Sequence, residues 1–220
     1  MIQDARPLAA FDDVDDAEEI DDTRETTMTS TPRPIDRPRI EAAVREILLA
    51  IGEDPDRDGL LDTPRRVAKA YGELFAGLGD SPAAHLARQF PQEGDDPVMV
   101  SDIPFTSMCE HHLLPFTGVV HIAYQPQHDR VVGLSKLART VEVIARRPQQ
   151  QERLTREVRE AIETHLDPAA VLVMVEATHS CMQIRGAKAR GATMRTRSVG
   201  GRWERDAATR REIQAMMGLD

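Results

Sequence analysis

Two short segments constrain this chain more than any other feature, because they hold its only two cysteines and three of its seven histidines. The first, at 107–116, contains Cys109 and His112, and the second, at 179–182, contains Cys181. Thiolate and imidazole are preferred zinc ligands, and the Cys-x-x-His spacing lets one turn place both around a single ion. The chain must therefore fold so that these distant segments meet.

The number of ligands indicates what kind of metal site this is. A structural zinc normally has four protein ligands, whereas a catalytic zinc keeps one position for water. Two cysteines and one histidine leave that position free, and His111 and His179 lie beside them with a titration range suited to proton transfer. We therefore expect an activated water working with histidine acid–base chemistry. A Cys109–Cys181 disulfide is the alternative that a reducing compartment disfavours.

The net charge of −9 on 220 residues is distributed unevenly. Residues 1–36 hold eleven acidic and three basic side chains, so the rest of the chain is almost neutral. This balance argues against a general nucleic-acid binder but allows local basic patches. No apolar run approaches the roughly 20 residues that span a bilayer, and no secretory signal pattern is found. We expect a cytoplasmic protein that binds no nucleic acid and no membrane.

The early part of the chain is predicted to change from disorder to helix. Residues 1–36 contain too few apolar groups to offset the entropy cost of ordering, which predicts a disordered acidic tail. Apolar residues at helical spacing then run from Pro38 to Gly52. The sequence therefore predicts an amphipathic helix directly after the tail.

A second helix is expected after a turn rich in aspartate. Residues 54–59 resemble the start of a calcium-binding loop, but Arg65 occupies the position that needs a bidentate glutamate. Calcium is therefore excluded. Thr63 can cap the helix that follows, and Pro64 can begin it.

The remaining chain combines strands with helices. We expect strands at 98–103 and 118–124, the second in a hairpin with 130–134, and the metal segment in a loop between strands. The most strand-like run is 171–181, whose period of two puts His179 and Cys181 on one face. Further elements are a helix capped by Ser135, a helix from Pro148, a strand near 193–199 and a helix at 206–217. This order predicts an α+β fold with an antiparallel sheet.

Basic residues near two helix starts are candidate phosphate ligands. Lys136 and Arg139 lie in the first turns of one helix, where unpaired N–H groups and the dipole already favour anions. Arg66 and Lys69 lie early in the helix after Pro64, where an ordinary solvated face is an equal alternative. Gln151 and Glu152 fall in the first turn of another helix, a placement that by itself is merely favourable for a helix.

Four motifs occurring in order make the chain resemble GTP cyclohydrolase I. The resemblance covers roughly residues 38–217 and leaves the acidic tail outside. It is carried by SMCEHH at 107–112, GLSKLAR at 133–139, RPQQQERL at 147–154 and HSCM at 179–182 with Arg185-Gly186, and it includes DTPRRVA at 62–68.

The resemblance implies a tunnelling fold, in which antiparallel sheets of several subunits join into a barrel with helices on one face. Together with the composition, it predicts three parts: an acidic tail at 1–36, an N-terminal helical region at 37–96 and a tunnelling-fold catalytic domain at 97–220. It also implies a toroidal homodecamer with active sites between subunits. The implied reaction converts GTP and water to 7,8-dihydroneopterin triphosphate and formate, the entry to folate or tetrahydrobiopterin synthesis.

The resemblance also assigns roles to residues. Zn²⁺ would be bound by Cys109, His112 and Cys181, which agrees with the ligand count above. Catalytic roles fall to His179, which would polarise guanine N7, to His111, which would assist, and to Ser135, which would transfer protons at the ribose. Substrate binding falls to Glu152 and Gln151 for guanine, and to Lys136, Arg139, Arg185, Arg66 and Lys69 for the triphosphate.

Some features depart from the resemblance, and three alternatives stay open. The segment 194–198 is more basic than expected of the family and receives no catalytic role. A structural zinc protein would need a fourth ligand and would lose folding without metal. Another tunnelling-fold enzyme, a pterin synthase or a queuosine-pathway reductase, would need three histidines or a cysteine nucleophile instead. The chemistry could also stop at the ring-opened formamidopyrimidine.

Overall fold

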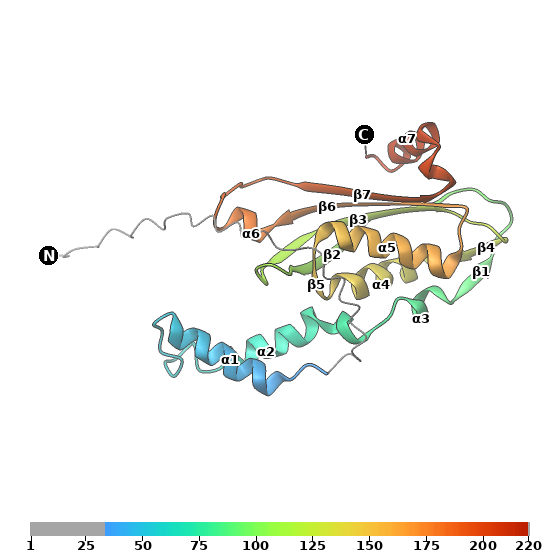
Figure 1. Cartoon of the computed structure of the whole chain (residues 1–220). Coiled ribbons are helices and arrows are strands. Elements are labelled where there is room, and N and C mark those ends of the chain that lie inside the picture. Colours follow the sequence, from blue (N-terminus) through green and yellow to red (C-terminus); the bar gives the residue numbers. More distant parts are fainter. Residues whose placement is uncertain (1–33, 220) are drawn as a thin grey trace, which may run out of the picture. The chain divides into compact units, whose positions relative to one another are not determined.

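The computed structural model describes residues 34–219, and these belong to one compact unit. The predicted acidic tail at 1–36 therefore lies almost entirely outside the described residues. The described part has a mixed α+β architecture in which one sheet forms the centre, as the order of elements predicted (Figure 1). No helix within residues 34–219 combines the length and the apolar character needed to cross a membrane.

The central sheet has five strands in the order β5-β2-β3-β6-β7. Three neighbouring pairs, β2 with β3, β3 with β6 and β6 with β7, are antiparallel, and the short β5 is parallel to β2. The strand bounds are β2 Val98–Cys109, β3 Pro115–Gln125, β5 Pro148–Gln149, β6 Ala170–His179 and β7 Met194–Gly201.

Two long helices cover one face of this sheet, and the C-terminal helix covers part of the other (Figure 1). Alternation along β6 explains the two cores, since Val171, Val173 and Val175 face α4 and α5 while Leu172 faces Trp203 and helix α7. The expectation of helices on one face is therefore incomplete. The bounds are α4 Leu134–Ala145, α5 Gln151–Leu166, α6 Ser180–Gln183, η2 Arg202–Glu204 and α7 Ala207–Met216.

The N-terminal elements are helical, as predicted. Helix α1 is Arg37–Ala50, with Asp36 accepting a hydrogen bond from the backbone of Arg39 at 3.1 Å as its cap. Helix α2 is Thr63–Leu74, and it is followed by η1 Ala76–Gly79 and α3 Ala83–Leu86. The predicted cap Thr63 is instead the first helical residue, after Asp62.

The predicted hairpin at 118–134 is wrong. Strand β4, Arg130–Val132, pairs with β1, Gln89–Pro91, in a separate two-stranded sheet, and β3 pairs with β2 and β6 instead. Composition marked the short strand correctly, but a three-residue strand carries too little pattern to specify its partner.

Four element boundaries also differ from the predictions. Strand β6 ends at His179, so Cys181 lies in α6 and not on the predicted strand face. Strand β2 continues to Cys109, so only the part of the metal segment at 110–114 is a loop. Helix α4 begins at Leu134 after Gly133, so Ser135 lies inside the helix and does not cap it. Pro148 and Gln149 form strand β5, and α5 begins at Gln151.

Gly118 marks a close approach between strands β3 and β6. A Cβ at this position would lie 1.9 Å from the carbonyl oxygen of Glu176 and 2.7 Å from the Cα of Ala177. Both atoms belong to the backbone, which cannot move without moving the strand. Only glycine fits here, two residues after Phe116.

Candidate active site at one end of the sheet

The strand directions bring the predicted metal ligands together. Strands β2 and β6 are both antiparallel to β3, so both end at the same end of the sheet. Cys109 is the last residue of β2 and His179 is the last residue of β6, where it stands opposite Phe116 of β3. Cys181 follows in α6, so segments far apart in sequence meet here as expected.

Cys109, His112 and Cys181 form a cluster whose ligand atoms all lie within 4.8 Å of one another. The Cys109 Sγ lies 3.8 Å from the His112 Nδ1. Zinc bonds of about 2.3 Å to sulfur and about 2.0 Å to nitrogen, arranged tetrahedrally, need a similar separation. Neither cysteine is in a disulfide. The donor types and their spacing therefore fit a zinc ion held by three protein ligands.

The cluster changes the acidity of its own thiol. Burial raises the pKa of Cys181, and the neighbouring Cys109 raises it further, while Arg185 opposes both effects. The Cys181 thiol therefore resists ionisation when no cation lies beside it. A bound divalent cation removes that cost, which is the usual coupling between metal binding and ligand deprotonation.

Arg153 holds the loop that carries the first two ligands, and sequence reasoning gave it no role. Its guanidinium forms an ion pair with Glu110, and it also donates to the Pro148 carbonyl at 3.0 Å and to the Gln149 side chain at 2.9 Å. The backbone N–H of Glu110 donates to the Gln149 carbonyl at 3.1 Å. These bonds fix the residue directly after Cys109, so the loop is shaped before any metal arrives.

His179 is half-buried at the inner side of the cluster. Its ring stacks on Phe116 with centroids 4.6 Å apart and an angle of 5° between the ring planes. Its Nε2 lies 2.8 Å from the Oε1 of Gln151. Burial lowers the pKa of His179, and the nearby Glu152 carboxylate partly opposes this effect. Perturbed acidity beside a metal cluster is typical of a catalytic site.

His111 occupies the outer side of the same cluster. It is exposed, its Nδ1 lies 3.9 Å from the Cys109 Sγ, and its Nε2 lies 3.2 Å from the amide nitrogen of Gln150. The structure thus brings His111 and His179 to the metal cluster from different elements. Glu152, in the first turn of α5, is exposed and close enough to His179 to influence its pKa.

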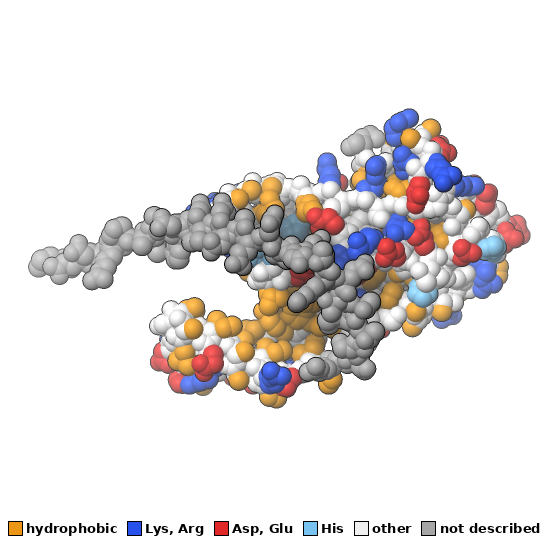
Figure 2. All heavy atoms as spheres, in the orientation of Figure 1, with side chains coloured by type: hydrophobic (Ala, Val, Ile, Leu, Met, Phe, Trp, Pro, Cys, Tyr) orange, Lys and Arg blue, Asp and Glu red, His pale blue; other side chains and the backbone are white. Residues whose placement is uncertain are grey.

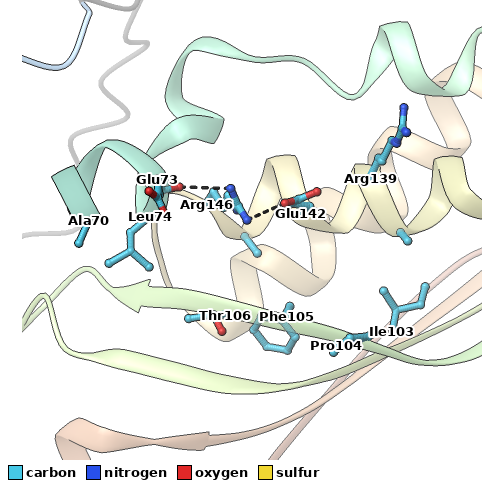
Figure 3. A pocket seen from close by; sticks show the side chains of 12 residues that line it. Ala70, Glu73, Leu74, Ile103, Pro104, Phe105, Thr106, Arg139, Glu142 and Arg146 are labelled. Carbon is cyan, nitrogen blue, oxygen red and sulfur yellow. Dashed lines mark hydrogen bonds and ion pairs between the residues drawn. The ribbon is translucent and has the colours of Figure 1, made fainter.

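The predicted phosphate ligands do not gather with the cluster in one chain. Arg139 lies in α4 above Ile103, as Figure 3 shows, and Ser135 and Lys136 lie still nearer the start of that helix. The other end of α4 approaches the cluster, because Ser107 donates to the Ala145 carbonyl at 2.6 Å. Cys109 lies six residue steps along β2 from Ile103, a distance of about 20 Å.

The other three predicted phosphate ligands lie outside helix α4. Arg185 is near Cys181, since it influences the pKa of that thiol. Arg66 and Lys69 are exposed on α2, and Arg66 pairs with Asp62 at 3.2 Å. Of the three, Arg185 is the one that the structure places beside a proposed metal ligand.

A cavity of about 640 Å³ lies away from the cluster, between α2, β2 and α4. Arg146 bridges its rim, bonding the carbonyl of Glu73 and the carboxylate of Glu142 (Figure 3). Phe105 and Leu74 contribute to an apolar lining, and only Arg139 among the predicted site residues borders it. This cavity therefore does not coincide with the candidate metal site.

The fold and the cluster define a class of protein, an α+β protein whose described residues include a candidate metal site of two cysteines and one histidine with two further histidines beside it. The family is shown by comparison with known sequences, since the model of the GTP cyclohydrolase I family matches residues 40–218. This chain belongs to the GTP cyclohydrolase I family.

Relatives from several bacteria match over most of their length. The GTP cyclohydrolase 1 of Carboxydothermus hydrogenoformans is 54% identical over 84% of this chain and 96% of that protein. That of Rhodopirellula baltica is 56% identical over 83% of this chain and 80% of its own. The GTP cyclohydrolase 1 of Bacillus cytotoxicus is 57% identical over 80% of this chain and 93% of that protein.

Proposed function

We propose that this protein converts GTP and water to 7,8-dihydroneopterin triphosphate and formate, the first step of folate or tetrahydrobiopterin biosynthesis. The observation that carries the proposal is the cluster of Cys109, His112 and Cys181 beside His179 and Glu152. Family membership and the names of the relatives support the same reaction.

Zinc fits the cluster better than a hard cation, because two thiolates and one imidazole are soft or borderline ligands. When bound, zinc lowers the pKa of a coordinated water toward neutrality. Cys109, His112 and Cys181 would hold the ion, and the ion pair between Arg153 and Glu110 would keep the loop in position.

Glu152 is proposed to select guanine. Its carboxylate can accept hydrogen bonds from both N1–H and the 2-amino group, a donor pair that adenine does not present. The side chain is exposed at the start of α5 and acts on the pKa of His179, so a base that it holds would lie near that ring. Glu152 would then hold guanine close to the ring of His179, which transfers the proton.

His179 is proposed to hold a proton at guanine N7, which makes C8 more electrophilic toward water. His111, on the exposed side of the cluster, would assist proton transfer as the imidazole ring opens and formate leaves. The lowered pKa of His179 suits a group that must give up its proton easily.

Lys136, Arg139, Arg185, Arg66 and Lys69 are proposed to bind the triphosphate, and Ser135 to transfer protons while the ribose opens and rearranges. In a single chain, Arg139 lies near Ile103, about 20 Å along β2 from Cys109, and Lys136 lies one turn nearer the start of the same helix. One chain alone would therefore leave its substrate without these cations. A second copy, which places the start of its α4 at the metal end of the first, would supply them.

Exposed apolar groups on the N-terminal helices support assembly of several copies. Helix α1 has no buried residue, and Ile47 and Ile51 are 58% and 71% exposed. Hydrophobic side chains gather beside α1 and α2 in the space-filling view (Figure 2). Such surface is costly in water unless another chain covers it. We propose a homo-oligomer, a decamer in the family's tunnelling-fold arrangement.

The proposed reaction is tested by incubating zinc-loaded protein with GTP and following two products together. Formate release and pterin fluorescence after oxidation are expected in equal amounts. Formate without pterin would mean that the reaction stops at the ring-opened formamidopyrimidine. Neither product would contradict the proposal and favour a structural zinc protein.

The role of His179 has its own test. The variant His179→Ala is expected to lose pterin formation, or to accumulate the ring-opened species, while its zinc content stays normal. Normal production of dihydroneopterin triphosphate by this variant would remove His179 from the mechanism and leave the metal site unaffected.

A further inference from the structure

Gln151 is enclosed more completely than a substrate ligand should be. It is the first residue of α5, beside the proposed guanine ligand Glu152, yet only 1% of its surface is exposed. A buried amide must satisfy its hydrogen bonds inside the protein. Its partners therefore show what it does.

The hydrogen bonds of Gln151 fix which way its amide points. Its Nε2 donates to the carbonyl oxygens of Val175 at 3.1 Å and Met194 at 3.0 Å, with the hydroxyl of Thr196 at 3.1 Å as a third partner. Carbonyl oxygens accept and never donate, so the –NH₂ group must face them. The Oε1 must then face His179, whose Nε2 lies at 2.8 Å.

This orientation determines the proton position on His179. An amide oxygen can only accept, so the hydrogen between the two groups belongs to His179 Nε2. The same nitrogen carries a hydrogen in both the neutral and the charged ring. Nδ1 is then the ring nitrogen that Gln151 leaves free to face a ligand. Stacking on Phe116, which is 1% exposed, holds the ring plane as well.

We propose that Gln151 is a positioning residue, which fixes the orientation and the tautomer of His179 so that Nδ1 faces the substrate. The proposal rests on the function proposed above, in which His179 serves guanine N7. It also replaces the expected contact between the Gln151 side chain and guanine, because the buried amide keeps all its partners within the protein.

Two threonines support this arrangement from behind. The Thr155 hydroxyl donates to the Gln151 carbonyl at 2.7 Å, and its oxygen lies 2.6 Å from the Thr196 hydroxyl oxygen. Thr155 is buried in α5 and Thr196 lies in β7. The segment 194–198, which received no role from sequence, thus contributes Thr196 to a chain of bonds that ends at His179.

The first test reads the tautomer directly in zinc-loaded protein. The ring nitrogens of His179 are observed by ¹⁵N NMR, with His179→Ala identifying the signals. We expect hydrogen on Nε2 in the natural protein and a mixture of tautomers in Gln151→Met, which keeps the side-chain length but lacks the acceptor. Hydrogen on Nδ1 in the neutral ring of the natural protein would overturn the proposal.

The second test uses kinetics. Gln151→Met is expected to lower kcat about 10-fold to 100-fold, as loss of a group behind a catalytic residue usually does, with KM for GTP and zinc content little changed. A rise in KM at constant kcat would instead mean direct substrate binding and contradict positioning. Gln214→Met, the same change on helix α7, controls for the loss of an amide elsewhere.

A double-mutant cycle separates this inference from the proposed function. If Gln151 acts through His179, Gln151→Met should cost nothing further in His179→Ala protein. Equal losses in both backgrounds would refute positioning while the role of His179 stands. Full activity of His179→Ala alone would refute that role first. If His179→Ala has no measurable rate, the NMR result decides, and melting temperatures show whether each variant is folded.

Discussion

The two ends of helix α4 differ in how much of a site one chain can build. Near the C-terminal end, Ser107 donates a hydrogen bond from β2 to the helix, and the proposed metal ligands lie together with His179 and its bond to Gln151. Near the N-terminal end, Ser135 and Arg139 are exposed and Lys136 is only half-buried. One chain thus holds the proposed metal ligands and proton-transfer groups in position, whereas it leaves the proposed anion-binding groups exposed to solvent.

The difference follows from what each group requires. Metal ligands and proton donors need placement within fractions of an ångström, which buried networks provide. Cationic side chains that bind a flexible triphosphate can be long and mobile, because their charge-assisted hydrogen bonds form when the ligand arrives and excludes water. A second copy can supply them without disturbing the metal end, and this division gives predictions for each region.

The largest effect is expected at the metal end. Cys181→Ala should abolish zinc binding and lower turnover by about 1,000-fold or more, since several kcal/mol of transition-state stabilisation depend on the metal. Metal analysis and formate release measure both effects. Met182→Ala, an exposed neighbour, should retain zinc and activity. If the zinc-free Cys181→Ala protein still turned over GTP, the proposal that the metal cluster takes part in the reaction would be contradicted.

Mixing two impaired variants tests whether one site uses two copies. Lys136→Ala should lower kcat/KM about 10-fold to 100-fold, the usual cost of a charge-assisted bond. Hybrids of Lys136→Ala and Cys181→Ala chains, co-expressed in equal amounts, should regain about a quarter of the natural activity, because some sites then combine two intact halves. If the hybrids are no more active than the Lys136→Ala chains that they contain, the metal ligands and Lys136 of one site come from the same chain.

The supporting bonds of the metal loop should have a smaller effect. Arg153→Met removes the partner of Glu110 and should weaken zinc binding about 10-fold to 100-fold, as loss of a group behind a metal ligand usually does. Competition with a chelator measures this affinity. Arg156→Met, which loses only an exposed contact of 3.7 Å with Glu160, is the matched control. Equal affinities would mean that the loop needs no anchor.

The smallest effect on folding is expected at Ile51, the C-cap residue that directly follows α1. Ile51→Ser replaces a side chain that is 71% exposed, so the free energy of unfolding of one chain should change by no more than about 0.5 kcal/mol. Assembly should nevertheless weaken, which sedimentation at several protein concentrations detects. Unchanged assembly would remove α1 from the contact between copies.

The sequence predicted the metal cluster because ligand chemistry leaves few alternatives for Cys109, His112 and Cys181. It also predicted the α+β class and the long elements, whose periodic patterns are strong. It did not predict that β4 pairs with β1, because three residues cannot specify a partner. Nor did it find Arg153 or the true surroundings of Gln151, since these depend on side chains that meet only after the helix packs on the sheet.

Gly118 limits how this site can change during evolution. Any larger residue there would push β3 away from β6 at the level of Glu176 and Ala177, and the displacement would reach the ring of Phe116 that supports His179. A library that varies position 118 should therefore return only glycine among active clones. A change of substrate during evolution therefore requires substitutions among the exposed side chains around Glu152, because β3 at Gly118 has no room for a larger residue.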